Sequence, residues 1–157
     1  MKHSRLLISL IAFVFFACQT NSKCSYLYFD GLENYLSEIH SVELHEIEDT
    51  ILYITPISNN CENCIKINLD MLQDVDNNRL MPILVGDDVA NKYKGKIQKI
   101  ENTFSKTLYD KEELVYSFRT GFSKPLLIHI VNGNCIYFLE VNDFVLNEAA
   151  SYIDANR

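Results

Sequence analysis

The sequence predicts an α/β domain in which helices flank a central mixed β-sheet. Three observations predict this fold class: strands and helices alternate along most of the chain, a β-hairpin follows them, and a helix closes the domain. A length of 157 residues is enough for one domain with a hydrophobic core and too short for two. With 48% hydrophobic residues, the chain has the composition of a globular protein.

Periodicity and turn residues predict the individual elements. Apolar residues three and four apart predict helices, whereas β-branched and aromatic runs predict strands. Asn132-Gly133-Asn134 predicts a tight hairpin turn, because Asn and Gly accept positive φ. In chain order we expect a helix over 31–40 capped by Asp30, strands over 42–47 and 50–55, a helix over 61–75, a strand over 80–85, a helix that ends near Phe104, a short strand over 107–109, a short helix over 111–118, strands over 125–131 and 135–141, and a helix over 143–154.

The N-terminal segment differs from the domain that follows it. Lys2 and Arg5 precede an apolar run over 6–17. That run has about 12 residues, whereas a helix needs about 20 to span a bilayer. Positive charges before a short apolar run are typical of a secretory signal. We therefore expect three parts: a signal peptide over 1–17, a tether over 18–29 and one domain over 30–157.

The end of the apolar run, Phe15-Phe16-Ala17-Cys18, resembles the lipobox of bacterial lipoproteins. The resemblance implies that Cys18 is lipidated and becomes the first residue of the mature chain. The protein would then be lipid-anchored in the cell envelope and face the periplasm. Phe15 departs from the motif, which usually has an aliphatic residue there. A signal peptide that is cut elsewhere and a short uncleaved anchor are the alternatives.

Charge excludes some partners. Without Lys2 and Arg5, the 14 basic residues become 12, against 21 acidic ones, so the mature chain has a net charge of −9. So acidic a surface repels nucleic acid and anionic lipid head groups. Membrane attachment is therefore expected through acyl chains rather than through a basic patch. We expect a monomer.

Cys61-Glu62-Asn63-Cys64 is the most informative motif. Thiol–disulfide exchange needs one sulfur that is exposed to attack and a second that resolves the mixed disulfide. At the start of a helix, the free first-turn N–H groups favour a thiolate by about 0.3–2 kcal/mol. Cys61 is therefore the predicted nucleophile and Cys64 the predicted resolving thiol. A structural disulfide and half of a zinc site are the alternatives.

The other cysteines and histidines do not extend this motif. A zinc site usually needs four ligands, and the chain has no second pair of cysteines at this spacing. No metal or cofactor is therefore expected. Cys135 begins a strand and is interpreted as a small buried residue, with a disulfide to Cys24 as the alternative. His129, within an apolar strand, is interpreted as a packed residue.

Two segments resemble the two halves of thioredoxin-like proteins. Segment 50–72 has the order strand, loop, Cys-x-x-Cys and helix, and segment 108–141 has short strand, short helix, glycine-containing loop, proline, strand, turn and strand. The likeness is closest to envelope-anchored thiol–disulfide oxidoreductases and redoxins. It implies that Pro125 is a cis-proline beside the dithiol, and that Lys124 and Pro125 bind the substrate peptide.

The chain departs from this family at three places. Asn60 stands where thioredoxins carry Trp, and Thr55 where many carry a buried acid that serves proton transfer. Between the cysteines lie Glu62 and Asn63, and the Glu62 charge opposes a thiolate at Cys61. A positive charge on a nearby Lys124 would offset part of this destabilisation of the Cys61 thiolate.

These observations predict an envelope lipoprotein that exchanges disulfides with cysteine-containing envelope proteins through Cys61. The alternative is a non-enzymatic binding module in which the Cys61–Cys64 bond is structural. A peroxidase-type redoxin comes third, because residues 56–61 lack the Pro-x-x-x-Thr-x-x-Cys loop of that group.

Overall fold

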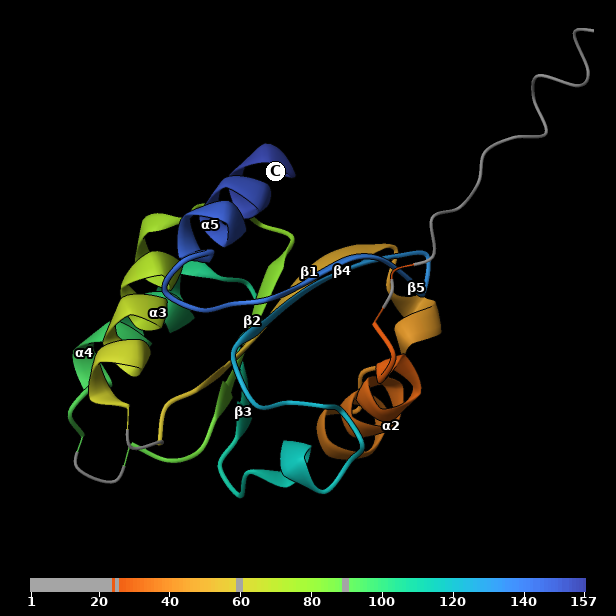
Figure 1. Ribbon diagram of the computed structural model, residues 1–157, viewed down its shortest axis with the longest axis horizontal. Helices are drawn as coiled ribbons and strands as arrows, with labels where there is room; N and C mark the ends of the chain where they lie inside the picture. The colour runs from red at the N-terminus through yellow and green to blue at the C-terminus, as the bar shows by residue number, and fades with distance from the viewer. Residues whose placement is uncertain (1–23, 25, 59–60, 89–90) are drawn as a thin grey trace, which may run out of the picture.

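The computed structural model describes residues 24, 26–58, 61–88 and 91–157. Five strands form one mixed sheet in the order β3-β2-β1-β4-β5 (Figure 1). β1 is parallel to β2, β2 is parallel to β3, and β4 is antiparallel to both β1 and β5. In chain order the elements are α2 (Phe29–His40), the 3-10 helix η1 (Leu44–Glu46), β1 (Asp49–Pro56), α3 (Glu62–Asp74), β2 (Leu80–Val85), α4 (Lys94–Thr103), β3 (Leu108–Asp110), the 3-10 helix η2 (Leu114–Tyr116), β4 (Leu126–Val131), β5 (Asn134–Glu140) and α5 (Leu146–Ala155). The predicted α/β class with a central mixed sheet is confirmed.

The central strand β1 divides the core into two layers. Ile51 and Tyr53 pack on one face of the sheet with apolar residues of α3, α4 and α5. Leu52 and Ile54 pack on the other face with apolar residues of α2. Figure 1 shows the same division, with α3, α4 and α5 on one side of the sheet and α2 on the other. β1 is buried from Ile51 to its end, which explains why its sequence is almost continuously apolar.

Strand pairing brings two distant segments to one edge of the sheet. β1 ends at Pro56, and α3 begins only a short loop later at Glu62. β4 begins beside the same end of β1, because Ile54 pairs with Leu126 in the antiparallel register. The residues just before β4 therefore lie next to the N-terminal end of α3.

Two predicted elements differ from the structure. The predicted strand over 42–47 is a loop that contains η1, and its buried Leu44 packs with the α2 layer. Six alternating residues are a weak signal, and here the hairpin turn packs on this segment: the Gly133 N–H donates to the Ile47 carbonyl at 3.1 Å. The predicted helix over 111–118 contains only η2, whose first turn is held by the Asp110 carboxylate.

The end of the predicted tether packs on the domain. A disulfide joins Cys24 to Cys135 at the start of β5, with the two Cα atoms 5.2 Å apart. Tyr26 is buried, lies against Phe138 and donates its hydroxyl hydrogen to the Thr120 carbonyl. The interpretation of Cys135 as a lone buried residue is therefore wrong, because the N-terminal segment runs along β5 and brings Cys24 to it.

Two further sequence interpretations concern His129 and the N-terminus. His129 is buried and contacts Asp49 and Tyr152, each at 2.8 Å, as a packed strand residue. The predicted signal peptide and Cys18 lie outside the described residues. Among the helices that are described, none combines the length and the apolar character that crossing a membrane requires.

Candidate functional site

Cys61 and Cys64 form a disulfide at the N-terminal end of α3, with their Cα atoms 5.2 Å apart. Cys61 is the residue directly before the helix, and its carbonyl accepts the first helical hydrogen bond, from the Ile65 N–H at 3.1 Å. Cys61 is exposed and Cys64 is half-buried. One sulfur is thus accessible to a large partner, while the other is partly covered by the fold.

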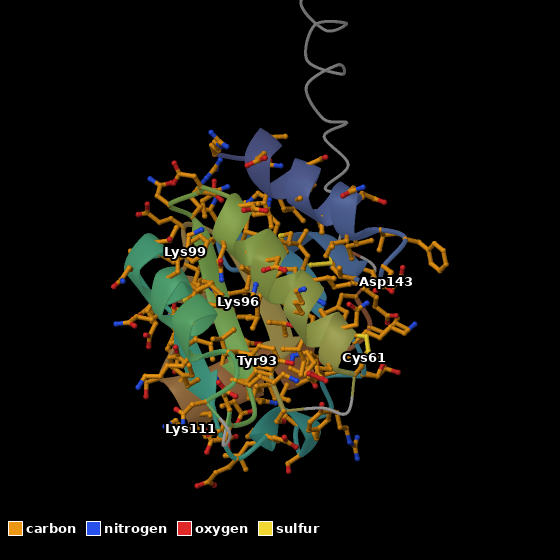
Figure 2. The ribbon with its side chains drawn as sticks, turned by 90° about the vertical axis from the view of Figure 1, so that its left-hand side faces the viewer. Cys61, Tyr93, Lys96, Lys99, Lys111 and Asp143 are labelled. Carbon is orange, nitrogen blue, oxygen red and sulfur yellow. A yellow bond between two sulfur atoms is a disulfide. The ribbon has the colours of Figure 1, made fainter. Side chains whose placement is uncertain are left out.

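The disulfide lies on a groove of about 510 Å³. Its walls come from the end of β1, the start of α3, the segment before β4 and the loop between β5 and α5. The lining residues are Pro56, Cys61, Cys64, Asn68, Ser123, Lys124, Pro125, Val141, Asn142, Asp143 and Phe144. Figure 2 shows Cys61 and Asp143 on the same side of the molecule. The predicted site residues Cys61, Cys64, Lys124 and Pro125 are therefore brought together by the fold.

The arrangement combines a parallel β1-α3-β2 unit with an antiparallel β4-β5 hairpin and a final helix α5 on the α3 side of the sheet. The dithiol begins α3, and Pro125 faces it from the start of the hairpin. The fold is thioredoxin-like.

The predicted cis bond between Lys124 and Pro125 is wrong, because no peptide bond between described residues is cis. A trans X–Pro bond is favoured by about 0.5–1 kcal/mol unless its surroundings require the cis form. Here the Pro125 carbonyl accepts a hydrogen bond from the Val141 N–H at 2.7 Å, so the β4–β5 ladder extends to Pro125 with the trans bond.

Two solved structures were found to be similar to this chain. A secreted disulfide oxidoreductase of Mycobacterium tuberculosis, homologous to E. coli DsbE, is 13% identical, with 69% of this chain and 81% of that chain covered and a TM-score of 0.45. A thiol:disulfide interchange protein from Bacteroides sp. is 14% identical, with 68% of this chain and 74% of that chain covered and a TM-score of 0.37. No protein-family model and no curated protein matches the sequence.

A buried polar chain supports the resolving cysteine. The Asn68 side-chain amide donates to the Cys64 carbonyl at 2.7 Å, and Tyr53 donates its hydroxyl hydrogen to the Asn68 side-chain oxygen. Burial raises the pKa of Tyr53, so this hydroxyl stays protonated and serves as a donor. Asn68 was missed by the sequence analysis, although a polar residue four positions after Cys64 on an otherwise apolar helix face was a usable signal.

Thr55 occupies the position where many thioredoxins carry a buried acid. It is fully buried, and its hydroxyl has no hydrogen-bond partner in the part of the chain that the structure describes. A neutral hydroxyl cannot store the proton of Cys64 as a carboxylate would. Asp143 is the carboxylate among the residues that line the groove, and it is exposed.

The Glu62 carboxylate forms an ion pair with Lys92, from the segment before α4. Lys124, the expected source of positive charge, does not pair with Glu62 but lines the same groove as Cys61. Sequence reasoning missed Lys92 because 30 positions separate it from Glu62 and only the packing of α4 against α3 brings the two together. Within the described residues, no group of three or more histidines, cysteines or acidic residues is placed to hold a metal ion.

We expect Cys61 to be alkylated before Cys64 when the reduced protein is treated with limiting iodoacetamide at neutral pH. The helix N-terminus favours the Cys61 thiolate, and partial burial slows access to Cys64, so the rates should differ by roughly 2- to 30-fold. Peptide mapping by mass spectrometry gives the two rates. Equal rates would contradict the assignment of Cys61 as the attacking thiol.

Proposed function

We propose that this protein is a thiol–disulfide oxidoreductase that acts on cysteines of other polypeptides in the cell envelope. The observation that carries the proposal is the position of the Cys61–Cys64 disulfide, at a helix N-terminus with the exposed Cys61 on an open groove. A disulfide that only rigidified the loop would need neither the groove nor the unequal exposure of its two cysteines.

The reaction can be written for the reduced protein. The Cys61 thiolate attacks one sulfur of a client disulfide, forms a mixed disulfide and releases the other client sulfur as a thiolate. Cys64 then loses its proton to water and attacks Cys61, so that the second client sulfur leaves as a thiolate. The client gains two electrons, and the protein becomes the Cys61–Cys64 disulfide. The reverse sequence of steps oxidises a client dithiol.

The groove supports a polypeptide client rather than a small thiol. It is open, and its apolar lining includes Pro56, Pro125, Val141 and Phe144. The Phe144 side chain is 96% exposed, and its N–H donates to the Asn142 side-chain oxygen at 2.9 Å, which fixes the turn that presents the ring. Lys124 and Pro125, opposite the dithiol, are proposed to contact the client backbone.

We also propose that Cys18 carries the acyl chains that hold the domain at the membrane. The support is the lipobox-like end of the N-terminal apolar run and the strong negative charge of the remaining chain, which disfavours attachment through basic residues. The short segment between Cys18 and the Cys24–Cys135 disulfide would keep the domain within about 20 Å of its anchor.

A Cys64→Ser variant should accumulate mixed disulfides with envelope proteins, because Cys61 can attack but the intermediate cannot be resolved. Non-reducing gels after acid quenching would show complexes that disappear on reduction. A Cys61→Ser variant is the matched control and should form none, with Cys24–Cys135 intact in both. If both variants are equally free of complexes, the alternative of a binding module with a structural disulfide is favoured.

Replacing Phe144 by Ser should lower kcat/KM for a disulfide-containing peptide with apolar residues beside its cysteine by roughly 5- to 30-fold, the loss of about 1–2 kcal/mol of apolar contact. Reduction of bis(2-hydroxyethyl) disulfide, which is too small to reach the ring and Cys61 together, should not change. Leu27→Ser, which removes another exposed apolar side chain outside the groove, is the control. An unchanged kcat/KM for the peptide would remove Phe144 from the client site.

A Cys18→Ala variant should leave the detergent phase and the membrane fraction, because stable anchoring needs two or more acyl chains. Mass spectrometry of the N-terminal peptide of the unmodified sequence should show an acylated Cys18. An intact Met1 terminus on a protein without acyl chains would refute the anchor and leave the exchange chemistry to be judged separately.

A further inference from the structure

The ion pair between Lys92 and Glu62 lies at the first residue of the dithiol helix. Glu62 directly follows Cys61, and a carboxylate there disfavours a second negative charge on the neighbouring sulfur. A cation that holds and neutralises this carboxylate restores the advantage that the helix N-terminus gives to a thiolate. The charge state of Cys61 is therefore coupled to a residue on another element.

The backbone of Lys92 is fixed by the Asp88 side chain. One carboxylate oxygen of Asp88 accepts from the Lys92 N–H at 2.8 Å, and the other accepts from the Tyr93 N–H at 2.7 Å. An exposed lysine side chain normally loses much of an ion pair's benefit to its own flexibility. Here the bidentate contact with Asp88 fixes the point from which the Lys92 side chain extends.

Tyr93 attaches this segment to α3. Its ring is buried in the core layer that contains α3, and its hydroxyl donates to the Glu62 carbonyl at 3.4 Å. The Lys92 ammonium also lies 5.8 Å from the centre of the Tyr93 ring, within the range of a cation–π contact. Side chain and main chain of Glu62 are thus both contacted by the pair Lys92 and Tyr93.

We propose that Lys92 is a positioning residue for the dithiol: it holds and neutralises the Glu62 carboxylate so that Cys61 keeps a reactive thiolate at neutral pH. Asp88 and Tyr93 fix Lys92 for this role. The inference rests on the proposed role of Cys61 as the attacking thiol and adds a residue that sets the reactivity of this site.

The other charged groups near the dithiol are arranged differently: Lys124 and Asp143 line the groove with Cys61 but neither pairs with Glu62. Lys66 lines the same small surface cavity as Glu62 and Lys92, but makes no ion pair with Glu62. Lys96 pairs with Asp70 of α3, and Lys99 makes no ion pair with any described residue. Figure 2 shows Tyr93 toward the Cys61 end of α3 and Lys99 toward the opposite end. Lys99 is therefore a matched control, because it carries the same charge on α4, directly after the segment that contains Lys92, and lies away from Glu62.

The experiment titrates the Cys61 thiolate by its ultraviolet absorbance in the full chain with Cys18→Ala and Cys64→Ser, so that Cys61 is the reporting thiol while Cys24–Cys135 stays closed. Lys92→Met should raise the pH midpoint, so that the thiolate fraction at neutral pH falls roughly 1.5- to 5-fold. Lys92→Arg should preserve the midpoint, and Lys99→Met should not move it. The effect of Lys92→Met should shrink at high salt, as expected for an exposed pair.

Repeating Lys92→Met in a Glu62→Gln background tests whether Lys92 acts through Glu62. We expect a much smaller shift there than with Glu62 present. An unchanged midpoint in the Lys92→Met protein, an equal shift in both backgrounds, or an equal shift with Lys99→Met would each overturn the proposal. Failure of the proposed function is separate: a Cys64→Ser protein that captures no client can still show the expected titrations.

Discussion

At the centre of the sheet, β1 pairs with β2 in parallel and with β4 in antiparallel register, and the dithiol depends on both pairings. The parallel partner requires a crossover, which α3 supplies, so the N-terminus of α3 lies at the end of β1. The antiparallel partner must begin where β1 ends, which places Pro125 beside the same edge. If β1 shifted by one residue relative to either neighbour, the side chains that now pack on one face of the sheet would point to the other. Such a shift is therefore strongly disfavoured.

The dithiol is supported by neutral and paired groups rather than by a buried charge. Under Cys64, Asn68 and Tyr53 form a hydrogen-bonded chain, and the buried Thr55 contributes a neutral hydroxyl rather than a carboxylate. Beside Cys61, the Glu62 charge is matched by Lys92. In the proposed exchange, Cys64 would lose its proton to water at the groove, where Asp143 is the acidic residue among those that line it.

The two disulfides have different positions and different consequences. Cys24–Cys135 closes a loop that covers most of the domain and lies at the turn end of the β4–β5 hairpin. Cys61–Cys64 lies at the opposite end of β4, beside Pro125. Constraint of the unfolded chain grows with the length of the closed loop, so the first bond contributes to stability, by about 2–4 kcal/mol. The second closes too short a loop to contribute much in this way.

The sequence by itself determined the mixed sheet, the position of the dithiol and the order of the elements other than the segments 42–47 and 111–118. Long apolar runs such as 50–55 and 80–85 are buried on both faces of the sheet, and both were correctly predicted to be strands. Hydrophobic burial is the main determinant of their structure. The motif Cys61-Glu62-Asn63-Cys64 needed no tertiary information, since its spacing at a helix start already predicts the exposed Cys61 and the half-buried Cys64. Only the tertiary structure decided the partner of Glu62, the bond between Cys24 and Cys135, and the trans bond before Pro125. Each of these depends on which distant segments pack together, and that packing is set by the summed burial of the whole core rather than by any local pattern.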